Sequence, residues 1–129
     1  MIKRGRILRK SKNIREMVSE NKLHLDNLIQ PIFLISGNNK REKIKTMEGI
    51  ERKSIDLQIK DIKKMVSLGI KSIIIFPSIE ENKKNKNATE ALNPKGLIPK
   101  AIKKIKKEFP ELVLITDIAL DPYNSDGHD

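Results

Sequence analysis

The sequence predicts an α/β protein built on a parallel sheet, and two observations lead to this prediction. Apolar runs rich in β-branched residues lie at residues 28–35, at residues 70–76 and from residue 112 onward, and such runs are typical of strands covered on both faces. The two stretches between them carry apolar residues at the helical period. The resulting order, strand-helix-strand-helix-strand, implies parallel strands joined by right-handed crossovers. A doubly wound sheet and a (β/α)8 barrel both have this order.

A basic segment precedes the first predicted strand and is interpreted as an N-terminal arm over residues 1–27. Ser11 is a suitable N-cap for a short helix that carries Ile14, Met17 and Val18. The arm offers positive charge to a phosphate or a partner subunit, and a solvated tail has the same composition. Its cationic residues are Arg4, Arg6, Arg9, Lys10 and Lys12.

The first predicted strand ends at Ser36-Gly37 and leads into the first predicted helix. Pro31 lacks an N–H group and is expected near an edge, a strand start or a bulge. Residues 38–53 are predicted to form a loop with room for one short strand. Ser54 is expected to cap the helix and Gly69 to end it. The apolar face of this helix consists of Ile55, Ile59, Ile62 and Val66.

The second predicted strand, residues 70–76, is closed by Pro77, and a polar loop follows over residues 80–93. The second helix begins after residues 94–99 and ends at Pro110, where the third strand follows at once. The inner face of this helix consists of Ile98, Ala101, Ile102, Ile105 and Phe109, and its outer face of Lys100, Lys103, Lys104 and Lys107.

Composition limits the class of protein. Hydrophobic residues make up 37% and charged residues 34% of the 129 residues, so a modest core is expected. The sequence has no cysteine, which excludes disulfides and thiolate metal sites. The first residues do not resemble a signal peptide, and residues 73–76, the longest apolar run, are too short to span a bilayer. We therefore expect a cytoplasmic location and no membrane partner.

The formal net charge of +10 suits a nucleic acid or an anionic surface. The alternative is a compositional bias toward Ile, Lys and Asn, which have AT-rich codons. The lysines are spread over several segments, and only Tyr123 and three Phe residues are available to stack on bases. We therefore expect no nucleic-acid partner.

The third strand runs into an acidic loop, which is the strongest candidate for a functional site. Asp117 still falls within the strand pattern, and burying an ionised carboxylate is costly unless it is paired or bound. Asp121 and Asp129 follow, with Asp126 and His128 between them. In parallel α/β proteins the C-terminal ends of strands line the active site. The sequence therefore predicts chemistry at this strand end.

Short segments along most of the chain form a series that is specific in its order and spacing. They are residues 6–18 (RILRKSKNIREMV), 28–33 (LIQPIF), 54–56 (SID), 68–70 (LGI), 76–79 (FPSI), 89–91 (TEA), 93–94 (NP), 96–98 (GLI), 116–123 (TDIALDPY) and 127–129 (GHD). With these segments the chain resembles the porphobilinogen synthase family, also called delta-aminolevulinic acid dehydratase. Two loop positions depart from the family pattern: Ser36, where Glu is common, and Glu48, where Pro is usual.

The resemblance implies the N-terminal part of a TIM (β/α)8 barrel, with about three of its eight strands. The arm over residues 1–27 would precede a partial barrel domain over residues 28–129, truncated in the loop after the third strand. The family condenses two molecules of 5-aminolevulinate into porphobilinogen, with loss of two waters, in tetrapyrrole and haem biosynthesis. Its two Schiff-base lysines lie later in the barrel, so no lysine here is assigned that role and the fragment alone is expected to be inactive.

The resemblance also implies roles for the acidic loop. Zinc-using members carry cysteines at the positions of Ala119, Asp121 and Asp129, and Ala119 has no ligand atom. Carboxylates suit hard cations, so Mg²⁺ or a monovalent cation is expected in the complete enzyme and no zinc site in this loop. Asp117 matches a catalytic, substrate-binding aspartate. Asp121 and Asp129 are expected to bind a cation or the substrate amine, and simple capping of the loop is the alternative.

Three function classes follow from the sequence. The leading class is a lyase of the porphobilinogen synthase family. The resemblance to this family implies 5-aminolevulinate as the substrate and a homo-octamer assembled through N-terminal arms. The second is a small stand-alone α/β binding or regulatory domain. The third is a basic nucleic-acid-binding protein.

Overall fold

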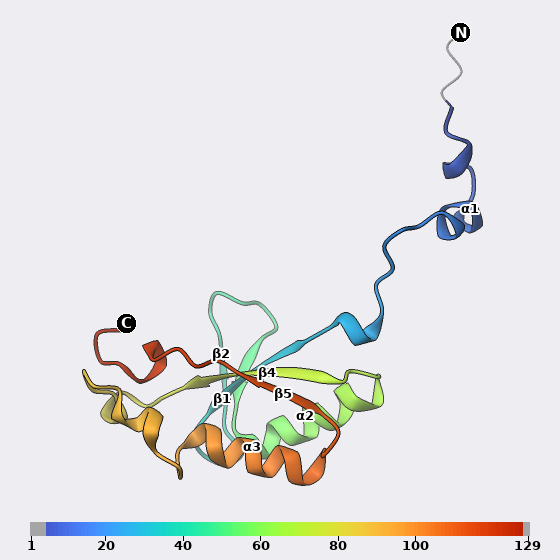
Figure 1. Ribbon diagram of the computed structural model, residues 1–129. Coiled ribbons are helices and arrows are strands. Elements are labelled where there is room, and N and C mark those ends of the chain that lie inside the picture. Colours follow the sequence, from blue (N-terminus) through green and yellow to red (C-terminus); the bar gives the residue numbers. More distant parts are fainter. Residues whose placement is uncertain (1–4, 128–129) are drawn as a thin grey trace.

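The computed structural model describes residues 5–127 as a five-stranded sheet with two helices on one face and an N-terminal arm that extends away from it (Figure 1). The strand order is β2-β3-β1-β4-β5. The central strands β1 (Gln30–Ile35) and β4 (Ser72–Ser78) and the edge strand β5 (Val113–Thr116) are parallel. These are the three apolar runs of the sequence, and the prediction of a parallel α/β fold is confirmed.

The two predicted strand prolines behave differently. Pro31 is the second residue of β1, beside Ile74, which agrees with its expected place near a strand start. Pro77 was predicted to close the second strand, and this is wrong, because β4 continues to Ser78 with Pro77 opposite Leu34. A proline removes only its own N–H from the ladder, so a strand can pass through it near an end.

A short hairpin occupies residues 41–53, where the sequence predicted a loop with room for one strand. β2 (Arg41–Lys43) and β3 (Glu51–Lys53) pair antiparallel, and β3 also pairs parallel with β1, with Arg52 beside Phe33. Both strands are charged and lack apolar alternation, so periodicity gave no signal for the second one. The hairpin adds two strands beside β1, so the sheet ends at β2 and β5.

Helices α2 (Ile55–Ser67) and α3 (Leu97–Glu108) cover the same face of the sheet (Figure 1). The predicted inner face of α3 is confirmed, with Ala101 and Ile105 at most 1% exposed. The predicted face of α2 is partly wrong: Val66 is 39% exposed, whereas Leu57 and Gln58, which the prediction left out, are buried. The core between the layers consists of Ile32, Leu34, Ile62, Ile73, Ile75, Ala101, Ile105 and Leu112.

Gln58 is buried because it has a partner in the sheet. Its side-chain Nε2 donates to the Phe33 carbonyl of β1 at 2.9 Å. Phe33 itself lies on the other side of the strand from the core residues Ile32 and Leu34, and its ring stacks on Phe76 with centroids 5.6 Å apart. The sheet therefore carries apolar side chains on both faces, and the two helices cover one of them.

Ser54 precedes α2 as predicted, but its hydroxyl does not cap the helix. It accepts from the Lys40 N–H at 3.0 Å and donates to the Lys40 carbonyl at 3.2 Å, and the residue is fully buried. Gly69 does end the helix: its φ is +93°, and its N–H donates to the Val66 carbonyl. Ser54 thus joins the hairpin segment to the start of α2.

The N-terminal arm carries a short helix, α1 (Lys12–Met17), which Ser11 caps as predicted. Several apolar side chains of the arm are exposed, including Ile7 at 71% and Leu23 at 79%. Asp26 and Lys71 form an ion pair of 2.6 Å where the arm meets the sheet. The proposed boundary at residue 27 stays a prediction. Within residues 5–127, no helix has the length and apolar character needed to span a membrane.

Candidate functional site

Three loops gather at the carboxyl ends of the parallel strands. They follow β1, β4 and β5, and in Figure 1 the segment after β4 and the C-terminal segment lie at the same end of the sheet. Parallel strands bring their carboxyl ends to one edge, which is where α/β proteins hold their active sites. This edge is the candidate site.

Asp117 lies at this edge, one residue after β5 ends at Thr116. The sequence pattern predicted that Asp117 lies within the third strand, where burial of its carboxylate would be costly. That part of the prediction is wrong, because Asp117 is exposed. Its Oδ1 accepts from the Ala119 N–H at 2.9 Å. This short turn fixes the carboxylate beside the strand end and leaves it open to water or a ligand.

The other predicted site residues follow in the same loop. Asp121 begins the 3-10 turn Asp121–Tyr123 and is half-buried. Asp129 and His128 lie outside the residues that the structure describes. Within residues 5–127, no group of three or more His, Cys, Asp or Glu side chains is placed to hold a metal ion. The proposed cation pair of Asp121 and Asp129 therefore stays a prediction.

Asp117 lines a pocket of about 300 Å³ between the start of α3 and the loop after β5. Glu90 and Tyr123 line the same pocket. Burial raises the pKa of the Tyr123 hydroxyl, and the nearby Glu90 carboxylate raises it further. A phenol with a raised pKa stays protonated at neutral pH and can donate a hydrogen bond.

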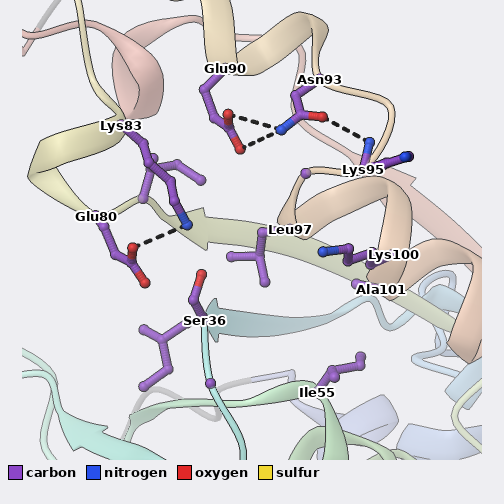
Figure 2. A pocket seen from close by; sticks show the side chains of 14 residues that line it. Ser36, Ile55, Glu80, Lys83, Glu90, Asn93, Lys95, Leu97, Lys100 and Ala101 are labelled. Carbon is purple, nitrogen blue, oxygen red and sulfur yellow. Dashed lines mark hydrogen bonds and ion pairs between the residues drawn. The ribbon is translucent and has the colours of Figure 1, made fainter.

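Glu90 also lines a second, larger pocket of about 600 Å³, shown in Figure 2. Its carboxylate accepts from the Asn93 amide at 3.0 and 3.2 Å. In the same pocket Lys83 pairs with Glu80 at 3.0 Å and holds the pKa of Glu80 below its ordinary value, mainly through their hydrogen bond and then through charge. Sequence reasoning did not assign Glu90 a role, although it lies in the TEA segment.

These features define an α/β protein whose candidate site lies at the carboxyl edge of parallel strands. A sequence profile of the delta-aminolevulinic acid dehydratase family matches residues 2–129, and the chain belongs to this family. This match agrees with the resemblance found in the sequence and favours it over a stand-alone regulatory domain or a nucleic-acid-binding protein.

Individual relatives give the same assignment. Over 126 residues the chain is 45% identical to the delta-aminolevulinic acid dehydratase of Bradyrhizobium diazoefficiens, covering 98% of this chain and 36% of the relative. It is 39% identical to that of Bacillus subtilis over 125 residues, covering 97% of this chain and 38% of the relative.

A solved structure supports the fold assignment. The Toxoplasma gondii enzyme, in complex with the reaction product porphobilinogen, superposes with a TM-score of 0.93 at 37% identity, covering 100% of this chain and 36% of that one. The chain is therefore part of a TIM barrel and spans little more than a third of the length of these proteins.

Proposed function

We propose that the whole protein represented by this chain is a porphobilinogen synthase. It condenses two molecules of 5-aminolevulinate into porphobilinogen and releases two waters, a lyase reaction of tetrapyrrole and haem biosynthesis. One observation carries the proposal: the chain superposes over its full length, with a TM-score of 0.93, on a relative in complex with porphobilinogen. The substrate comes to this chain through that relative and the family.

Asp117 is proposed as the catalytic residue of this part of the barrel. The reaction forms carbon–carbon and carbon–nitrogen bonds between two amino ketones, so protons must be moved at an amine and at carbons next to a carbonyl. A carboxylate that is exposed at a strand end and held by the Ala119 N–H can stabilise an ammonium group or accept its proton. Asp121 and Asp129 are proposed either to bind the substrate amine beside it or to hold a cation there.

The Schiff-base lysines are proposed to lie outside residues 1–129. Family resemblance places them later in the barrel, and this chain covers 36% of a product-bound relative. Residues 1–129 alone are therefore proposed to be inactive. Some lysines of this chain form ion pairs with carboxylates instead, as Lys83 does with Glu80 and Lys53 does with Asp61.

A hard cation is proposed for the complete enzyme, with Asp121 and Asp129 as its ligands in this loop. The donor chemistry fits Mg²⁺ or a monovalent cation, because the loop offers carboxylates and Ala119 offers no donor atom. Such an ion would supply positive charge near the substrate. The absence of cysteine leaves zinc without thiolate ligands in this loop.

A homo-oligomer is proposed through the N-terminal arm, with an octamer as the family's assembly. The exposed Ile7 and Leu23 side chains on an arm that extends away from the sheet are suited to pack on another copy (Figure 1). A cytoplasmic location, without nucleic-acid or membrane partners, completes the proposal.

The experiment is an assay of the full-length protein with 5-aminolevulinate, followed by borohydride trapping and mass spectrometry. Porphobilinogen should form, and the trapped substrate should lie on lysines beyond residue 129. Formation of no porphobilinogen by the full-length protein would overturn the activity. A substrate adduct on a lysine within residues 1–129 would overturn the placement of the Schiff bases.

A further inference from the structure

Two loops of the candidate edge are joined through one residue, Asn85. Asn85 lies in the loop after β4, whereas Tyr123 and Ser125 lie in the loop after β5 that also carries Asp117. The Asn85 N–H donates to the Tyr123 carbonyl at 3.3 Å, and the Ser125 N–H donates to the Asn85 carbonyl at 3.3 Å. Both backbone polar groups of Asn85 therefore bind the loop that carries the proposed catalytic residue.

The Asn85 side chain orders its own loop so that these backbone groups are presented. Its Oδ1 accepts from the Asn87 N–H at 3.1 Å and from the Thr89 N–H at 3.2 Å. Its Nδ2 donates to the Thr89 hydroxyl at 2.6 Å. Three side-chain hydrogen bonds thus close a tight turn, and the Ala88 N–H completes it by donating to the Asn85 carbonyl at 3.0 Å.

The turn needs this support because its backbone is strained. Ala88 has a φ of +48°, in the left-handed region that non-glycine residues rarely adopt, and its side chain is only 4% exposed. A residue stays in that conformation only where its surroundings over-determine it. Here the Asn85 side chain bonds to residues on both sides of Ala88.

A rigid turn carries the constraint from Tyr123 toward Asp117. The N–H groups of Tyr123 and Asn124 donate to the Leu120 carbonyl at 2.8 and 3.0 Å. Leu120 is in turn adjacent to Ala119, whose N–H holds the Asp117 carboxylate. Asn85 is therefore connected to the Asp117 carboxylate by hydrogen bonds and one covalent step, the peptide link between Leu120 and Ala119.

We propose that Asn85 is a positioning residue for the reaction: through its contacts to Tyr123 and Ser125 it fixes the loop that carries Asp117 and Asp121. The catalytic part of this proposal rests on the proposed function. Asn85 does not touch the substrate in this proposal, and it acts only through the loop it holds.

The test compares three variants of the full-length enzyme. Asn85→Ala removes the side-chain bonds, and kcat should fall on the order of tenfold or more, with a smaller change in KM, because misplacing a catalytic group is costly. Asn85→Asp keeps an oxygen that accepts from the Asn87 and Thr89 N–H groups, and its second oxygen can accept from the Thr89 hydroxyl, so it should restore most of kcat. The control is Asn87→Ala, which keeps the N–H that bonds to Asn85 and should retain kcat.

A second readout separates this inference from the proposed function. Amide hydrogen exchange at Ser125 should be faster in Asn85→Ala than in wild type, whether or not the protein makes porphobilinogen. If Asn85→Ala does not fold, Thr89→Val removes one bond of the turn and should give the same changes at smaller size. Unchanged exchange at Ser125, or a fall in kcat that Asn85→Asp does not restore, would overturn the inference.

Discussion

On the helix-covered face of the sheet Ile32, Leu34, Ile73 and Ile75 are at most 2% exposed, whereas at the carboxyl edge of the same strands Asp117 and Asn85 are exposed. The first region is apolar and closely packed against α2 and α3. The second is polar and is held by hydrogen bonds between short turns.

The difference shows how one sheet separates stability from chemistry. Buried aliphatic groups contribute through the area they remove from water, which does not depend on the identity of the loops. Hydrogen bonds within the exposed loops contribute little to the free energy of unfolding, but they determine the position of the Asp117 carboxylate. Substitutions in the two regions should therefore have opposite signatures, and the following predictions test this from the largest effect to the smallest.

Asp117→Asn in the full-length enzyme should lower kcat by about 10²–10⁴-fold, because it removes the charge and the proton-accepting ability of an acid–base group. The Asn Oδ1 can still accept from the Ala119 N–H, so the free energy of unfolding should change by less than about 0.5 kcal/mol. Porphobilinogen assays and urea unfolding measure the two quantities. Asp126→Asn, an exposed carboxylate of the same loop, is the control and should retain activity. Full activity in the Asp117→Asn variant would contradict the proposed role of Asp117.

Ile75→Ala should destabilise residues 1–129 by about 2–5 kcal/mol, because it opens a cavity in the core between the layers. For a domain of about 5–15 kcal/mol total stability this is a large share of the free energy of unfolding. Ile74→Ala removes the same atoms from the half-buried neighbour on the opposite face and should cost clearly less. Urea unfolding followed by circular dichroism measures both. Equal losses for the two variants would show that the two faces are equally packed.

Gln58→Ala should cost about 1–3 kcal/mol, because the partly buried Phe33 carbonyl loses the donor that the buried Gln58 side chain supplies. The matched control is Gln30→Ala: Gln30 makes a similar contact to the Pro31 carbonyl at 3.1 Å, but in an exposed place. Water can replace the lost donor there, so the control should change the unfolding free energy by less. The same urea experiment distinguishes them, and a reversed order would contradict the burial argument.

Lys83→Met should raise the pKa of Glu80 toward its ordinary value, since Lys83 supplies the two largest effects that lower it. A carboxylate whose pKa is lower in the folded state stabilises the fold above its unfolded pKa, and that contribution is lost as pH falls through the folded pKa. The variant should therefore be slightly less stable than wild type at pH values above the ordinary carboxyl range, and this difference should disappear as the pH falls through and below that range. NMR titration of Glu80 measures the shift, with Lys84→Met, which changes the Glu81 pair, as control. An unmoved Glu80 titration in Lys83→Met would refute the assignment.

The parallel strands, the two helices and the family could all be predicted from the order of the residues. Continuous β-branched runs predicted the three parallel strands, and the inner face of α3 followed from its helical period. The end of α2 at Gly69 could be predicted because glycine readily adopts the positive φ that often follows a helix. The sequence also predicted a site at the end of the third strand that includes Asp117, and the structure places Asp117 one residue beyond that strand, lining a pocket. These features depend on neighbours in the sequence or on simple burial, which a residue pattern records.

The features that join distant segments became visible only in the folded protein. The β2–β3 hairpin, the bonds of Ser54 to Lys40 and the bonds of Asn85 to Tyr123 and Ser125 are made largely by backbone groups. Every residue carries the same backbone groups, so no side-chain pattern predicts which of them will meet. The burial of Gln58 has the same cause, because its partner is a carbonyl of β1 that lies 25 residues away in the chain.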